Sequence, residues 1–244
     1  FSDDGFFRRA DLFELGVPPL RFSLLDAFGA PWQVCFYWLA TLAALVAMLV
    51  GWHARLASAL AWLLVTGFHE RTHYPFDGSD SLLRVMLFWA MFAQLGRVAS
   101  IDALRSAPVD RAVRIPAVPV RVLQLQLLWM YASAAIFKLE GPLWRDGTAL
   151  HYALSAPSSF TRAWATGLAD VALFVRAATW GSIAFEALFP LLVIASWRRP
   201  RLRLLVLAAG VAFHLGIDAM MSVGNCPIVV FAAYVMLQPP SWAA

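Results

Sequence analysis

One lysine stands out among the residues that could carry acid–base chemistry. Lys138 is the only lysine among 19 basic residues, and all the others are arginine. Arginine keeps its proton in proteins, whereas the amine of a desolvated lysine can become neutral and act as a base. Lys138 ends a long apolar segment, just before the helix-breaking Gly141-Pro142. The alternative interpretation is a charged lysine that reaches the aqueous interface from a helix terminus, where the helix dipole favours its charge.

Four charged residues lie inside apolar segments, where an ionised side chain is costly unless it faces a partner, water or the bundle interior. These residues are Arg84, Arg176, Glu186 and Asp218. Asp218 follows His214 by four residues, so the two share one face of a helix. A His–Asp pair in this position could orient a quinone or relay a proton, and it could equally tie two helices together.

The segment 69–73 reads His-Glu-Arg-Thr-His and matches the H-E-x-x-H zinc signature. In that signature two histidines on one helix face bind the metal and the glutamate is the general base, which would assign these roles to His69, His73 and Glu70. Here the match lies at the end of a short apolar segment, and Pro75 follows it closely. Chance matches to a pattern with so few fixed positions are common. An intramembrane zinc protease is therefore the most distant functional hypothesis, and no metal is expected.

The composition indicates the environment of these residues. The chain is 61% hydrophobic and 14% charged, against about 25% charged in an ordinary soluble domain. Lipid offers the backbone no hydrogen-bond partners, and long continuous apolar segments favour helices over a barrel. The predicted fold is all-α, a polytopic transmembrane helix bundle of about seven spans. The expected spans are Trp32–Trp52, Leu56–Phe68, Ser81–Leu95, Val120–Phe137, Val171–Trp197, Leu202–Met221 and Ile228–Leu237.

The distribution of charge predicts an orientation rather than a nucleic-acid partner, since basic loops stay cytoplasmic. One side of the predicted bundle holds residues 1–31, 69–80, 138–170 and 222–227, with seven basic and eleven acidic residues. That side is expected to face the periplasm or a lumen. The arginine-rich side is Arg55, Arg97, Arg105, Arg111, Arg114, Arg121, Arg198, Arg199, Arg201 and Arg203. Residue 1 is then outside and the C-terminus cytoplasmic.

An outside N-terminus without a signal sequence predicts that one further helix, or a removed targeting segment, precedes Phe1. The chain is interpreted as a single integral-membrane domain over 1–244. Within it, residues 1–31 form an extracytoplasmic loop and residues 32–238 form the helix bundle.

Several short stretches carry a resemblance to a known family. They are Phe-Ser-Leu-Leu-Asp-Ala at 22–27, Ser-Ile-Asp-Ala-Leu at 100–104, the stretch from Tyr131 through Lys138 to Trp144 and Gly147, Phe213-His214, and Tyr-Val-Met-Leu at 234–237. In this order they resemble the membrane domain of vitamin K-dependent gamma-carboxylase and its bacterial relatives, the horizontally transferred transmembrane (HTTM) proteins. The resemblance covers roughly residues 20–238. The carboxylase has an important histidine three residues before its Ser-x-Asp motif, and this chain has Arg97 there.

The resemblance implies a helix bundle with a quinone or lipid pocket that opens towards the outer leaflet of a bacterial inner membrane. The family enzyme oxidises vitamin K hydroquinone with oxygen, and a lysine in its Tyr–Lys–Trp stretch begins by deprotonating the hydroquinone. By position that lysine is similar to Lys138. As an enzyme, the chain would use Lys138 as the base, with Tyr131, Trp144, His214 and Asp218 lining the pocket.

A second hypothesis makes the same bundle a non-catalytic structural or quinone-adjacent subunit of a larger membrane protein complex. The short, loop-poor chain fits that class as well. Both hypotheses expect the lipid bilayer as a partner, and the second adds other membrane-protein subunits. The sequence leaves the choice between them open.

Overall fold

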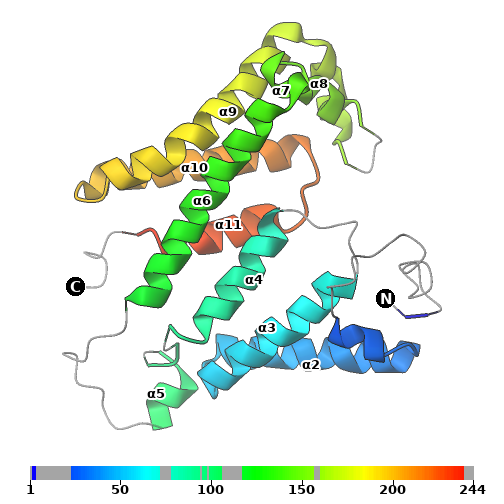
Figure 1. The fold of residues 1–244 in the computed structure, drawn as a ribbon, viewed down its shortest axis with the longest axis vertical. Helices are drawn as coiled ribbons and strands as arrows, with labels where there is room; N and C mark the ends of the chain where they lie inside the picture. Colours follow the sequence, from blue (N-terminus) through cyan, green and yellow to red (C-terminus); the bar gives the residue numbers. More distant parts are fainter. Residues whose placement is uncertain are drawn as a thin grey trace. The chain divides into compact units, whose positions relative to one another are not determined.

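The computed structural model describes residues 2–3, 23–71, 78–93, 95–97, 99–105, 117–156 and 160–238, and most of these are helical (Figure 1). The chain divides into two compact units, residues 1–123 and 124–244, which are described separately below. The interpretation of 1–244 as one domain stays a prediction. The expected extracytoplasmic loop over 1–31 falls mostly outside the described residues.

Among the described residues, four helices are long and apolar enough to cross a membrane: α2 (Pro31–Leu49), α6 (Val118–Glu140), α9 (Ala172–Ala195) and α10 (Pro200–Met220). Large apolar side chains lie on their surfaces, and Leu173, for example, is 83% exposed. Apolar surface of this extent indicates hydrocarbon rather than water around the helices. The predicted all-α membrane bundle is therefore confirmed.

The other three expected spans also form helices, α3 (Ala54–Arg71), α4 (Gly78–Ala90) and α11 (Cys226–Val235). Helix α3 has 18 residues but carries three charged side chains. Helices α4 and α11 have 13 and 10 residues. At about 1.5 Å per residue both are shorter than a hydrocarbon core of about 30 Å. That these three helices also cross the membrane stays a prediction.

The first unit is built on α3, which packs against α2 on one side and α4 on another. Two glycines allow the close approach of α2 and α3. A Cβ on Gly67 would lie 2.0 Å from the Tyr37 hydroxyl oxygen, and Gly51, in the turn between the helices, has φ +65°. The Tyr37 hydroxyl donates to the Leu64 carbonyl at 3.0 Å. Small residues at these positions therefore set the spacing of the helix pair.

The Ser-Ile-Asp stretch at 100–102 caps the start of α3, although the two segments are far apart in the sequence. It opens the short helix α5 (Ile101–Arg105). One oxygen of the Asp102 carboxylate accepts from the His53 backbone N–H at 2.9 Å, and the other accepts from Ala54 at 2.8 Å. Both bonds lower the pKa of Asp102 below its ordinary value, and the bond from Ala54 has the larger effect. A stretch that carried the family resemblance therefore satisfies the amides at the start of α3, which lack partners within the helix.

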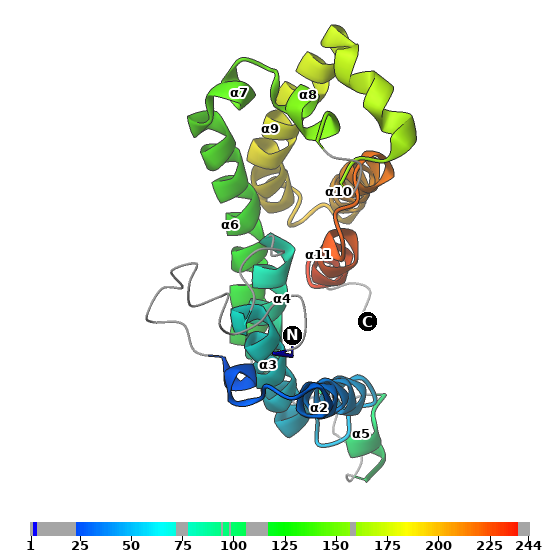
Figure 2. The ribbon, with the colours of Figure 1, turned by 90° about the vertical axis from the view of Figure 1, so that its right-hand side faces the viewer.

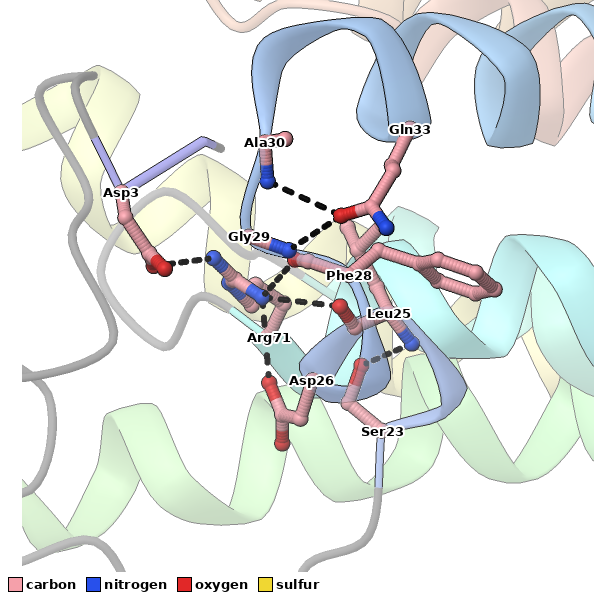
Figure 3. Close-up of polar contacts among 9 residues, drawn as sticks. All are labelled: Asp3, Ser23, Leu25, Asp26, Phe28, Gly29, Ala30, Gln33 and Arg71. Atoms are coloured by element: carbon pink, nitrogen blue, oxygen red, sulfur yellow. Dashed lines mark hydrogen bonds and ion pairs between the residues drawn. The ribbon is translucent and has the colours of Figure 1, made fainter.

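Buried Arg71 joins the end of α3 to the segment before α2 (Figure 3). Its Nη1 donates to the carbonyls of Leu25 at 2.8 Å and Phe28 at 3.2 Å, which lie in and just after the 3-10 helix η1 (Leu24–Ala27). Its guanidinium also lies 3.6 Å from the carboxylates of Asp3 and Asp26. A planar guanidinium with five donors suits this combination of carbonyl and carboxylate acceptors.

The second unit contains α6 from residue 124 onward, then α7 (Pro142–Arg145), α8 (Ala149–Leu154), the 3-10 helix η2 (Ala163–Asp170), α9, α10 and α11. Helix α10 packs against both α9 and α11. Helices α7 and α8 and η2 lie together near the start of α9 and contact it (Figures 1 and 2).

A buried arginine fixes the turn between α9 and α10. Arg203 is 1% exposed, its Nη2 donates to the Val193 carbonyl at 3.1 Å, and its guanidinium carbon lies 4.2 Å from the ring centroid of Trp197. The guanidinium and the Ser196 hydroxyl thus both donate to this carbonyl at the end of α9, where helical backbone donors run out. From this turn the two helices diverge towards the end where α8 lies (Figure 1).

Candidate binding pocket in the second unit

Lys138 forms an ion pair with Glu186 from α9. The Lys138 Nζ lies 2.5 Å from each oxygen of the Glu186 carboxylate, and the two side chains are 20% and 9% exposed. The Nζ also lies 4.9 Å from the ring centroid of Trp144, close enough for a cation–π contact. Lysine, glutamate and indole therefore form one polar cluster in otherwise apolar surroundings.

The end of α6 positions two members of this cluster. The helix ends at Glu140, and Pro142 begins α7 after a single intervening residue, Gly141. Proline suits the first turn of a helix because its missing N–H has no helical acceptor there. A Cβ on Gly141 would lie 3.0 Å from the Trp144 ring, so glycine lets the indole fold back over Lys138. The position of Lys138 directly before the Gly-Pro break agrees with the sequence interpretation.

Lys138, Glu186 and Trp144 line a cavity of about 370 Å³. Its remaining lining is almost wholly apolar or small, with Ala149, Leu150 and Ala153 from α8, residues of α9 including Gly181, and residues of α10 including Phe213, Gly216 and Ile217. Ligand pockets typically combine apolar walls with a few polar groups in this way. The Lys–Glu pair supplies one donor group and one acceptor group, with no net charge, at a single place on the wall.

Tyr131 and His214 form a separate buried cluster with Tyr234. The Tyr131 hydroxyl oxygen lies 2.6 Å from His214 Nε2 and 2.5 Å from the Tyr234 hydroxyl oxygen. The three residues are at most 7% exposed and join α6, α10 and α11. None of them lines the cavity. The structure therefore places these two predicted pocket residues in the polar core of the unit.

Aromatic rings separate that cluster from the cavity. Phe213 lines the cavity and stacks on Phe185 with their centroids 4.3 Å apart. Phe185 in turn lies edge-on to Tyr131 at 6.2 Å. Tyr131 and the adjacent Phe189 have their centroids 4.4 Å apart. A ligand in the cavity would therefore contact this aromatic layer rather than the hydroxyl groups behind it.

Asp218 lies at the edge of the unit, apart from His214 in its contacts. Arg162 donates from Nε to the Asp218 carbonyl at 2.7 Å, and its Nη2 lies 3.4 Å from the carboxylate. His214 is bonded instead to Tyr131. The spacing of four residues predicted a His–Asp pair, but the two side chains have different partners. Their proposed role in lining a quinone site stays a prediction.

The H-E-x-x-H match is only partly visible, because His73 lies outside the described residues. His69 Nε2 lies 3.8 Å from the Asp80 carboxylate, and Glu70 is paired with Arg84 from α4. Within the part of the chain that the structure describes, no three histidine, cysteine or carboxylate side chains form a group that could hold a metal.

Glu186 is the cavity residue whose partner the sequence interpretation did not assign. It was recognised as a costly charge inside a span, yet its partner was not assigned. The available signal was the opposite charge of Lys138 at the end of another span, since buried charges in membranes usually occur in pairs. The separation of 48 residues between them gave no spacing rule to connect the two.

The fold and the pocket define a class: an integral, polytopic helical membrane protein with a charged pair facing an apolar cavity. The family model of the HTTM domain matches residues 19–242. The chain therefore belongs to the HTTM domain family, as its short stretches predicted. No curated protein sequence and no solved structure matches the chain.

Proposed function

We propose that the second unit binds the ring of a hydroquinone-like lipid and that Lys138 removes a proton from a ring hydroxyl. The observation that supports this most directly is the Lys138–Glu186 pair on the wall of an apolar cavity of about 370 Å³. Membership of the HTTM domain family makes a carboxylase-like membrane domain the natural comparison.

The charge of the site favours a neutral ligand. A lysine and a carboxylate together carry no net charge, so an anionic head group would gain attraction from one partner and repulsion from the other. A ring hydroxyl can donate to the Glu186 carboxylate and accept from the Lys138 Nζ. The apolar walls would receive the ring, and Trp144 and Phe213 offer it aromatic faces.

The paired carboxylate gives Lys138 a route to its basic form. The ammonium passes one proton to Glu186, which leaves a neutral amine beside a neutral carboxyl group. This proton transfer within the ion pair costs less where water is scarce, because a low dielectric penalises charged groups. The neutral carboxyl group now donates to the ring oxygen, and the ring hydroxyl donates to the Lys138 amine. The ring O–H bond then breaks as an N–H bond forms on Lys138, and the resulting oxyanion lies beside the new ammonium. Arginine cannot replace lysine in this step because it does not release its proton.

Quinol-dependent oxygen uptake by the purified protein in lipid nanodiscs tests the proposal. Lys138→Arg is expected to abolish uptake while the protein stays folded, and Glu186→Gln is expected to reduce it strongly. Glu140→Gln is the matched control, because Glu140 is an exposed carboxylate on α6 only two residues from Lys138. Uptake that survives Lys138→Arg unchanged would overturn the role of Lys138. Ring binding without any uptake by the wild-type protein would favour the non-catalytic subunit, which native mass measurement after mild extraction would reveal as part of a complex.

We also propose that the protein lies in a bacterial inner membrane with its C-terminus cytoplasmic and the Lys138 end of α6 towards the periplasm. The support is the excess of arginine on the opposite loops. A reporter that is active only in the cytoplasm should be active when it is fused to the C-terminus. Activity of a periplasm-specific reporter at that position would reverse the orientation.

A further inference from the structure

The cavity is closed on the side of α8. The Leu150 backbone N–H donates to the Thr179 hydroxyl of α9 at 3.2 Å, and Leu150 itself lines the cavity. His151 Nδ1 lies 2.8 Å from the Ala169 carbonyl, which ties α8 to η2. Thr179 is 1% exposed. The α8 side of the cavity is thus attached to α9 and η2 by two part-buried hydrogen bonds.

A strap of residues 160–164 is attached to the last turn of α10 by hydrogen bonds. Arg162 donates from its backbone to the Met220 carbonyl at 2.9 Å and from Nε to the Asp218 carbonyl at 2.7 Å. The Trp164 indole donates to the Ala219 carbonyl at 3.0 Å. Met220 lines the cavity. These bonds hold the last turn of α10 beside the cavity, and Phe213, which stacks on Phe185, forms another part of the cavity wall.

The cavity reaches the surface between α9 and α10. Gly181 of α9 and Ala212 and Gly216 of α10 line the cavity and are also exposed on the surface. A Cβ added to Gly181 or Gly216 would meet no atom within 4 Å. Both helices are membrane-spanning by length and composition, and Leu215 beside the opening is 51% exposed. Exposed surface within a membrane-spanning segment faces hydrocarbon.

We infer that the opening formed by Gly181, Ala212 and Gly216 is a lateral portal, through which the ligand enters from the bilayer and its hydrocarbon tail leaves the cavity. The inference rests on the proposed function, since it concerns the ligand of that site. The size of the cavity supports it. A volume of about 370 Å³ is near the lower end of the range of roughly 300–1,000 Å³ for pockets that enclose whole drug-sized ligands. A ring fits, and a long tail must extend elsewhere.

The portal gives the tail room to pass and does not itself bind the tail strongly. Lipid hydrocarbon solvates a tail about as well as an apolar protein groove does, so the groove adds little affinity. Small residues matter because they leave a gap through which a tail can run while the ring is seated beside Lys138. Filling the gap should therefore exclude a tailed ligand and spare the same ring without its tail.

Binding of two probes to the protein in nanodiscs tests this. One is a 1,4-naphthoquinone with a long polyprenyl tail, and the other is the same ring with only a methyl group. Gly181→Leu and Gly216→Leu are expected to weaken the tailed probe at least tenfold and to change the affinity for the short probe by less than threefold. Gly167→Leu is the matched control, because Gly167 also has open space around its Cβ position and does not line the cavity.

Equal loss of both probes would overturn the portal, as would unchanged binding of the tailed probe. Failure of the wild-type protein to bind either probe would instead remove the proposed function on which the portal depends. A second measurement needs no ligand. A fluorophore on Gly216→Cys, with Cys35 and Cys226 replaced by serine, should be quenched by brominated acyl chains and not by aqueous iodide. The reverse pattern would show that the opening faces water and would overturn the lateral route.

Discussion

The Lys138–Glu186 pair makes a quantitative prediction about stability. Glu186→Gln removes one charge, Lys138→Met removes the other with a side chain of similar length, and the double variant removes both. Each single variant leaves an uncompensated charge or a polar group in the apolar cavity, whereas the double variant leaves no charge there. The three variants and the wild type together form a thermodynamic cycle that isolates the interaction between the two residues.

The expected size of that interaction follows from the burial and geometry of the pair. Two unit charges about 4 Å apart attract by about 4 kcal/mol at an effective dielectric of 20. Here the atoms are 2.5 Å apart, and the side chains are only 20% and 9% exposed, so water screens them weakly. Removing one partner of a buried pair costs about 3–5 kcal/mol. We therefore expect each single variant to lose about 3 kcal/mol and the coupling free energy to exceed about 2 kcal/mol.

Reversible unfolding of the detergent-solubilised protein by sodium dodecyl sulfate, followed by circular dichroism, measures these free energies. Glu140→Gln again serves as the control and should lie within about 0.5 kcal/mol of the wild type, as surface substitutions usually do. A coupling of about 0.6 kcal/mol is the average for a hydrogen bond between membrane helices. A value at or below that level would refute the reasoning, because it would mean that lysine and glutamate are not paired in the folded protein.

Three further predictions concern the packing of the two units. Asp102→Asn should destabilise the first unit above the ordinary pKa of a carboxyl group and have little effect at low pH. The reason is that the two backbone amides lower the pKa of Asp102 in the folded state, so its stabilisation is lost as pH falls through that lowered pKa; a pH series of unfolding midpoints checks this. Arg71→Met should cost about 2 kcal/mol or more, since the buried Leu25 carbonyl and the part-buried Phe28 carbonyl lose their donor, and limited proteolysis before residue 30 should become faster. Gly210→Ala should cost about 1–3 kcal/mol by overpacking, because its Cβ would lie 2.3 Å from the Tyr234 hydroxyl, whereas Gly216→Ala, in open space, should leave the unfolding midpoint equal or higher.

The helices and their ends could largely be predicted from the sequence. Continuous apolar segments gave helices at all seven expected places, and the Gly-Pro pair after Lys138 predicted the end of α6 to within a few residues. These features depend on local chemistry: the period of the backbone hydrogen bonds, the missing N–H of proline and the free-energy cost of placing charged groups in hydrocarbon. The family resemblance rested on short stretches of the same local kind.

The partners of the buried polar groups could not be predicted in the same way. Spacing along α10 suggested that His214 and Asp218 act together, yet His214 contacts Tyr131 and Asp218 contacts Arg162. Glu186 was visible as a charge in a span, but only its opposite charge pointed to Lys138, and no spacing rule connected the two residues. Helix rotation and the course of the 160–164 strap decide which side chains meet.

The sequence by itself determined the environment of this protein: with so few charged residues, its helices must lie in lipid. The tertiary structure alone decided that one lysine and one glutamate, 48 residues apart, share a cavity whose open side is marked by two glycines. The physical reason is that hydrophobicity acts on each residue separately and is therefore readable in composition. An ion pair or a gap between helices depends on how two surfaces are rotated against each other, and that is set only by the packing of the whole unit.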